Sequence, residues 1–158
     1  MRVYRDTRFA KDKTPYKTNI GIQFRHEVGK DVHAPGYYMH VEPSSAFVGV
    51  GMWRPAASAL AGIRERIVAR PDEWRQIIEN KAFKARYELQ GDSLKRPPRG
   101  FDSDAVHMHD LKRKDHMAVM DLTPDQIADA RFPVKLGKEL MKATAYMTFL
   151  CQSVEVPF

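Results

Sequence analysis

The chain of 158 residues has a single cysteine, Cys151, which excludes an internal disulfide and any metal site built from several cysteines. It also lacks an apolar run near the roughly 18–20 residues that a membrane-spanning helix needs. Its N-terminus is polar and basic, without the apolar segment of a secretory signal, so we expect a cytoplasmic protein. Cys151 ends the apolar stretch 147–151, a context that indicates a buried small side chain rather than a reactive thiol.

The common catalytic and nucleotide-binding motifs are missing as well. No P-loop, GxGxxG, GxSxG or HExxH pattern occurs in the sequence. Gly49-Val-Gly51 is not a dinucleotide fingerprint, because it lies inside a predicted strand rather than at a strand-to-helix turn. The six histidines follow no metal-ligand spacing, so no metal site is predicted. The sequence neither supports nor excludes enzyme activity, and it names no cofactor.

Positive charge is in excess, with a formal net charge of +6, and it is concentrated in the first seventeen residues. That segment interleaves Tyr and Phe with two aspartates and six cations: Arg2, Arg5, Arg8, Lys11, Lys13 and Lys17. Arginine is well suited to bidentate capture of carboxylate or phosphate. In one interpretation Arg5, Arg8 and Lys13 converge on a bound anion while Asp6 orients a guanidinium. In the other, aspartates neutralise these cations internally and only lock the loop.

The same segment resembles the signature of the uncharacterised bacterial and fungal family known as domain of unknown function 2461. The signature reads RxxRDxRF, followed by Asp or Asn with Lys and then by Tyr. It is matched here by Arg2, Arg5, Asp6, Arg8, Phe9, Asp12, Lys13 and Tyr16. Three later blocks, at 36–43, 46–53 and 96–101 with 111–114, are also similar to the family. The resemblance covers nearly the whole chain. It implies that the chain shares the fold of the family, which has no established activity.

The chain departs from the family at its beginning. Members usually carry a helical segment before the signature, whereas this sequence starts at the signature itself. We therefore expect residues 1–158 to form a single domain that is a shortened version of a longer one, or a sequence whose start is misassigned. A shortened domain would leave part of its core face uncovered. A second copy of the chain could cover that face, so a homo-oligomer is one expected partner arrangement.

Hydrophobic periodicity predicts an α+β fold in which a small, mainly antiparallel sheet packs against helices. Strands are expected near 2–5, 18–26, 36–42, 46–53 and 116–120. Helices are expected from Pro55 onward, ending with one long helix from about 134 to 151. Because strands come first and helices follow, an alternating α/β sheet is not favoured. Gly49 and Gly51 leave room on one strand face for a packed helix or a ligand.

The leading hypothesis is a domain that binds an anionic, phosphate-bearing ligand. The residues expected to bind it are Arg5, Asp6, Arg8, Lys13, Tyr16, Tyr38, Arg96 and Arg99. His40 and Glu42 are the acid–base candidates if a reaction occurs, because period-two spacing puts both side chains on one strand face, although a structural pair fits them as well. One alternative is a nucleic-acid-binding module, since cations interleaved with aromatics suit phosphate contact and base stacking. Another is a structural or interaction domain without a ligand.

Overall fold

The structure is a computed structural model that describes residues 18–24 and 34–158. A five-stranded antiparallel sheet has the strand order β1-β2-β3-β5-β4. Its strands are β1 (Ile20–Phe24), β2 (Gly36–Glu42), β3 (Ser45–Met52), β4 (Glu88–Gln90) and β5 (His116–Asp121). The described helices are α1 (Ala57–Ala69), α2 (Pro71–Ile78), α3 (Lys81–Lys84), α4 (Met108–Leu111), α5 (Pro124–Ala128), α6 (Phe132–Met141) and α7 (Thr144–Ser153). This is the expected α+β class, and no described helix is long and apolar enough to cross a membrane.

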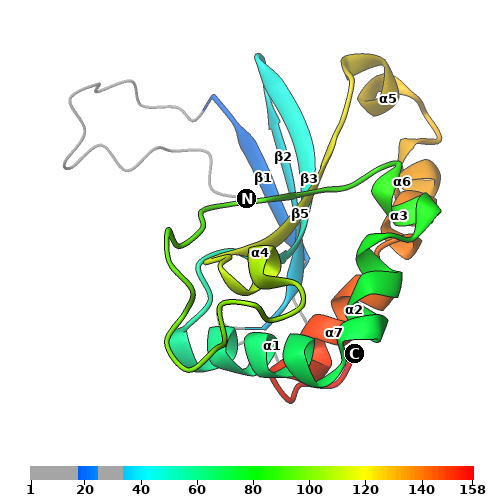
Figure 1. The fold of residues 1–158 in the computed structure, drawn as a ribbon. Coiled ribbons are helices and arrows are strands. Elements are labelled where there is room, and N and C mark those ends of the chain that lie inside the picture. The colour runs from blue at the N-terminus through cyan, green and yellow to red at the C-terminus, as the bar shows by residue number, and fades with distance from the viewer. Residues whose placement is uncertain (1–17, 25–33) are drawn as a thin grey trace, which may run out of the picture.

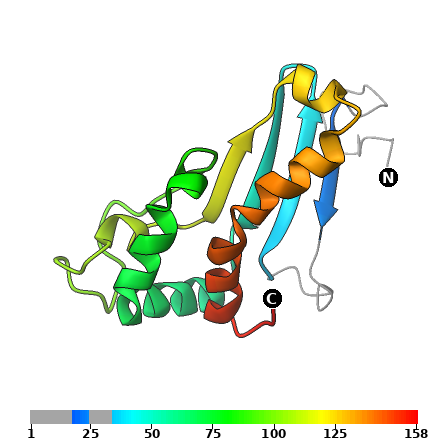
Figure 2. The same cartoon turned by 90° about the vertical axis from the view of Figure 1, so that its right-hand side faces the viewer.

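The helices gather on one face of the sheet. Figure 1 views the sheet nearly edge-on, with α2, α3, α6 and α7 on one side, and Figure 2 shows α6 and α7 running across that face. Alternate residues of the central strands, such as Val48 and Val50 of β3, point into the core beneath these helices. They pack with Ile63 of α1, Trp74 of α2 and Leu150 of α7, all fully buried. We call the opposite side of the sheet the open face.

The strand predictions are largely confirmed where the structure describes them. The strand expected at 36–42 has those bounds, and the strand expected at 46–53 spans Ser45–Met52. The strand expected at 116–120 runs one residue further, to Asp121, while of the expected 18–26 the residues Ile20–Phe24 are a strand. The strand expected at 2–5 lies outside the described residues. Strand β4, with only three residues, was not predicted because so short a segment carries no usable periodicity.

The helix predictions need two corrections. The first helix begins at Ala57 and not at Pro55, because the chain first turns through Arg54, which has φ 48° and whose N–H is held by Asp115. The closing segment is two helices, α6 and α7, rather than one. At the break, the N–H groups of Lys142 and Ala143 bond to carbonyls three residues back, those of Glu139 and Leu140, and the Tyr87 hydroxyl also donates to the Glu139 carbonyl. The last turn of α6 is therefore tightened, and a tertiary contact adds to the hydrogen bond that this carbonyl already accepts.

Cys151 lies within α7 and is 1% exposed. Burial raises the pKa of its thiol to about 11. A thiol so placed carries little thiolate at neutral pH, and the thiolate is the nucleophilic form. The prediction of a buried small side chain is therefore confirmed.

Candidate functional site

The open face of the sheet has a pattern set by strand register. Residues directly opposite each other in an antiparallel pair lie on the same face. Tyr38 of β2 faces Gly49 of β3, and the next pair on that face is His40 with Phe47. On β5, Met117 and Val119 continue the same rows. The face is thus built from aromatic and flexible apolar side chains next to glycines, with few branched residues to fill it.

Two of these glycines let larger side chains lie flat on the sheet. A Cβ at Gly21 would come within 2.7 Å of the Tyr38 hydroxyl, and a Cβ at Gly49 within 2.8 Å of the Met117 sulfur. The sequence left open whether a helix or a ligand lies against Gly49. No helix lies there: the Met117 side chain covers this glycine, and the helices occupy the other face.

A groove of about 650 Å³ lies along this face, toward the end where β2 begins and β3 ends. Three glycines, Gly36, Gly51 and Gly91, keep part of its lining free of side chains. The larger lining side chains are Gln23, Tyr37, Tyr38, Phe47, Met52, Trp53, Gln90, Met117 and Val119. Aromatic and apolar walls with a few amide and hydroxyl groups are the usual make-up of a small-molecule site. We call this hollow the open-face groove.

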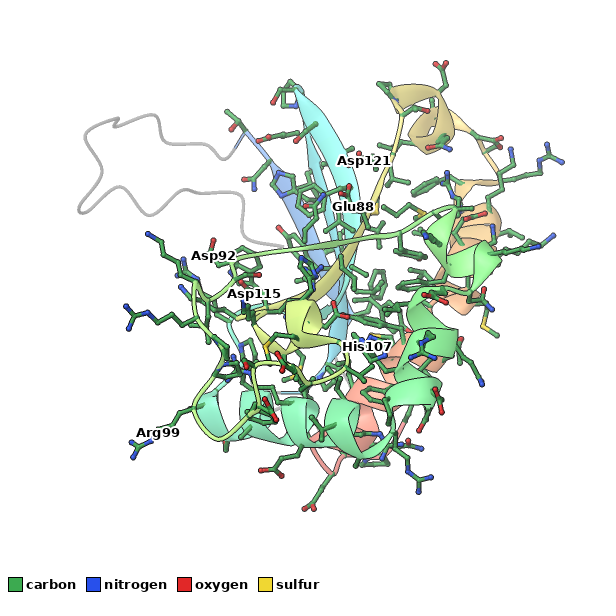
Figure 3. The ribbon with its side chains drawn as sticks, viewed as in Figure 1. Glu88, Asp92, Arg99, His107, Asp115 and Asp121 are labelled. Carbon is green, nitrogen blue, oxygen red and sulfur yellow. The ribbon has the colours of Figure 1, made fainter. Side chains whose placement is uncertain are left out.

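Two loops close one end of the groove, and a buried carboxylate holds them together. Asp115, 3% exposed, accepts hydrogen bonds from the N–H of Arg54 at 2.7 Å and the N–H of Asp92 at 3.1 Å. Figure 3 shows Asp92 and Asp115 close together on this side of the sheet. Gly91 has φ 113°, and a Cβ there would come within 2.5 Å of the Asp115 Cβ. Only glycine fits this position, so the chain passes tightly over Asp115.

At the other side of the groove, three polar side chains of β2 form a connected series. The Tyr38 hydroxyl lies 3.1 Å from Nδ1 of His40, and Nε2 of His40 lies 3.5 Å from a carboxylate oxygen of Glu42. The imidazole also stacks on Phe47, with ring centroids 5.0 Å apart and planes inclined by 18°. The His40 side chain is 15% exposed, so its position is fixed by contacts on both edges and one face.

Glu42 is held in turn by the tight turn between β2 and β3. Ser45 and Ser44 donate their hydroxyls to one oxygen of the carboxylate, at 2.9 Å and 3.2 Å. These hydrogen bonds, with that of Ser45 as the larger cause, lower the pKa of the Glu42 carboxyl. Glu42 is therefore an anion at neutral pH, and its other oxygen faces the imidazole.

The structure brings together some of the residues that the sequence nominated. Tyr38, His40 and Glu42 form the series just described, as their period-two spacing predicts. Arg96 and Arg99 are exposed on the irregular segment after β4, and Figure 3 shows Arg99 directed away from the sheet. Neither arginine lines the open-face groove. The remaining candidates lie outside the described residues: Arg5, Asp6, Arg8, Lys13 and Tyr16.

Other residues of the groove were not foreseen. Met117 and Val119 sit on a strand that was predicted, but nothing in that strand's pattern tells which face stays open. Gln90 belongs to the short strand β4, and Trp53 follows β3 directly. Gly49 and Gly51, which precede Trp53, were the sequence signal that could have located the groove, because they mark a strand face that side chains do not fill.

A second hollow, of about 780 Å³, lies between α1 and the C-terminal residues 152–156. Its lining is mostly alanine, glycine and serine, and of its two arginines, Arg66 and Arg70, the first is already engaged. Arg66 pairs with Glu73 at 3.4 Å and lies over the Phe149 ring, 4.9 Å from its centroid. We therefore regard this hollow as a packing defect between helices and not as the candidate site. Within residues 18–24 and 34–158, no three His, Cys, Asp or Glu side chains are grouped so that they could hold a metal ion.

No curated protein and no solved structure is significantly similar to the chain. The model of one protein family, described as "conserved hypothetical protein (DUF2461)", matches residues 1–149, as the N-terminal signature predicts. The chain therefore belongs to this family of unknown function.

Proposed function

We propose that this protein binds a small ligand with an anionic group, and that the open-face groove holds the body of that ligand. The observation that carries the proposal is a groove of about 650 Å³ with aromatic walls, bordered by a hydroxyl group that a histidine and a carboxylate hold in place. Its volume and lining are in the range of small-molecule pockets. The phosphate-binding role of Arg5, Arg8 and Lys13 stays a prediction, and so does any contribution of Arg96 and Arg99.

A thermal-shift screen with a groove-filling variant tests this proposal. Val119→Trp would place an indole in the groove, because Val119 lines it and is partly exposed. The matched control is Val68→Trp on α1, where the side chain is 48% exposed and distant from the groove lining. We expect a phosphorylated or carboxylated metabolite to raise the melting temperature of the parent and of Val68→Trp, but not that of Val119→Trp.

Other outcomes would decide against the groove. A ligand that stabilises Val119→Trp as much as the parent would bind elsewhere. A short single-stranded oligonucleotide in the same screen, measured at several salt concentrations, identifies the alternative partner, because phosphate contacts make affinity fall steeply with salt. If no compound stabilises the parent, the interpretation as a structural domain without ligand gains support.

We also propose that two copies of the chain associate through β1. Ile20, Ile22 and Phe24 are 46%, 42% and 50% exposed. Their register with Val41, Met39 and Tyr37 puts them on the core face, beyond the helices that cover the neighbouring strands. β1 stands at one end of the described strand order, and its five residues carry no charge.

The exposed side chains of β1 suit contact between two copies. Ile20, Ile22 and Phe24 lie on one face of the strand, so two such faces can pack against each other and exclude water. Sedimentation velocity over a range of concentrations should show a dimer for the parent and for Val68→Lys. Ile22→Lys should remain a monomer, because a charged side chain would be buried in the joined face. A parent that is monomeric at high concentration would contradict this second proposal.

A further inference from the structure

Only one member of the Tyr38–His40–Glu42 series reaches the open-face groove. Tyr38 lines the groove, whereas His40 and Glu42 lie behind it along β2. Any influence of His40 on a bound molecule therefore passes through the Tyr38 hydroxyl. The state of His40 determines whether the Tyr38 hydroxyl can donate a hydrogen bond to a ligand in the groove or only accept one.

The charge on Glu42 fixes one of the two imidazole nitrogens. An ionised carboxylate can only accept hydrogen bonds, so Nε2 of His40 must carry a proton to interact favourably with it across 3.5 Å. The remaining nitrogen, Nδ1, faces the Tyr38 oxygen at 3.1 Å. When the ring is neutral, Nδ1 accepts the phenolic O–H. When the ring is protonated, Nδ1 donates to the phenolic oxygen instead.

These two states present opposite groups to the groove. With neutral His40, the Tyr38 proton is used in the bond to Nδ1, and only an oxygen lone pair faces the groove. With charged His40, the phenolic oxygen accepts from the ring, and its own O–H is released to donate. A donor backed by an imidazolium stabilises a negatively charged oxygen, whereas a lone pair repels one.

We propose that the Tyr38 hydroxyl binds the anionic end of the ligand while His40 is protonated. That end is an oxyanion, such as a carboxylate, sulfonate or phosphate. This inference rests on the proposed small-molecule function and adds the ligand's chemistry and its position. The rest of the ligand would be apolar or aromatic, because the lining beside Tyr38 includes Phe47, Met117 and Val119.

The other charged groups on this face agree with that position. Around His40, β1 contributes Gly21 opposite, and β3 contributes Phe47 and Ser45. Asp121 of β5 faces Phe47, and Glu88 of β4 faces Val119 (Figure 3). The charged side chains that the described strands place on this face are thus carboxylates, which disfavour an anion near Asp121. Neither Asp121 nor Glu88 lines the groove, so the oxyanion has its place at Tyr38.

A pair of probes of equal shape tests the inference. Benzenesulfonate is anionic at every pH used, and benzenesulfonamide is its uncharged counterpart. Binding to the full chain is followed by NMR chemical shifts at pH 5.5 and pH 8. We expect benzenesulfonate to bind at least about tenfold more tightly at the lower pH, as one charge-assisted hydrogen bond implies, and benzenesulfonamide to bind equally at both.

Variants assign the effect to this series. Tyr38→Phe should abolish the pH dependence, while Tyr146→Phe, the same change in a buried tyrosine of α7 that does not line the groove, should keep it. Nitrogen NMR of the His40 ring without any probe gives an independent readout: the neutral ring should carry its proton on Nε2, and Glu42→Gln should change that preference.

The possible outcomes test the role of Tyr38 separately from the groove as a binding site. Probes that bind equally at both pH values, or a neutral ring protonated on Nδ1, would overturn the role of Tyr38 and leave the groove as a binding site. Probes that fail to bind at either pH would count against the groove itself, and the inference would fall with it.

Discussion

A group of polar side chains is buried around Trp74, on the helix side of the sheet. The indole N–H donates to Asp110 at 3.0 Å, and Nε of Arg113 donates to the other oxygen of that carboxylate at 3.1 Å. His116 meets the indole edge-on, with ring centroids 6.1 Å apart, and is fully buried. Burial, with Arg113 as the next cause, lowers the pKa of His116 from 6.5 to about 4. The folded protein therefore holds this imidazole in its neutral form.

His116 should make the protein sensitive to acid. Between pH 6.5 and 4 the unfolded chain binds a proton at this position and the folded chain does not, so the free energy of unfolding falls as the pH falls. A shift of this size corresponds to roughly 3 kcal/mol, present in full above pH 6.5 and lost by about pH 4. Urea unfolding at pH 4.5 and 7 should show a smaller pH effect for His116→Phe than for the parent.

The control for this measurement is Val48→Ala. Val48 is 2% exposed and carries no ionisable group, so its truncation should lower stability at both pH values and keep the pH dependence of unfolding. If His116→Phe loses as much stability on acidification as the parent does, other groups cause the effect and His116 is not its origin.

At the scale of elements, helices α1 and α7 meet through a glycine. A Cβ at Gly62 of α1 would come within 2.4 Å of the backbone oxygen of Ser153, at the end of α7. Gly137 of α6 has no heavy atom within 4 Å of such a Cβ. The two positions are both helical glycines, but only the first is required by close packing.

Replacing each of these glycines by alanine should have opposite effects. Gly62→Ala must push α1 and α7 apart, because a backbone oxygen cannot move aside as a side-chain end can, and we expect a loss of about 1–3 kcal/mol. Gly137→Ala should add about 0.5–1 kcal/mol, since alanine loses less backbone freedom on folding. Urea unfolding measures both, and two changes of the same sign would contradict the helix contact described here.

The elements that could be read from the sequence are those with a clear local pattern. Alternation located β2 and β3 within one residue. The same alternation placed His40 and Glu42 on one face. The division of the closing helix was missed, because the apolar periodicity continues through residues 142–143, where α6 ends and α7 has yet to begin. The groove was missed because the choice of covered sheet face depends on where all the helices pack.

At the scale of the whole molecule, one hydrophobic core joins the sheet to the helices. Its buried residues come from β2, β3 and β5 and from α1, α2, α3, α4 and α7. Trp74 lies at its centre and is fully buried, whereas Trp53 at the groove is 59% exposed. A shared core gives neither layer enough buried surface to remain folded alone. The single-domain organisation expected from chain length remains a prediction.

Unfolding should accordingly be a single cooperative step. In Trp53→Phe the remaining tryptophan, Trp74, reports on the core, while far-ultraviolet circular dichroism reports on all helices and strands. We expect the two signals to follow one urea transition with the same midpoint. Separate midpoints would show that the sheet and the helices unfold as independent units.

The carboxylate of Asp115 has a further consequence for the loops at the end of the groove. Loop amides generally exchange their hydrogens with solvent early, because loops open at little free-energy cost. The amides of Arg54 and Asp92 differ, since both are bonded to one buried side chain at the start of β5. Their exchange requires the end of a central strand to open. The amides of Arg54 and Asp92 should therefore exchange their hydrogens as slowly as the amides of the sheet do.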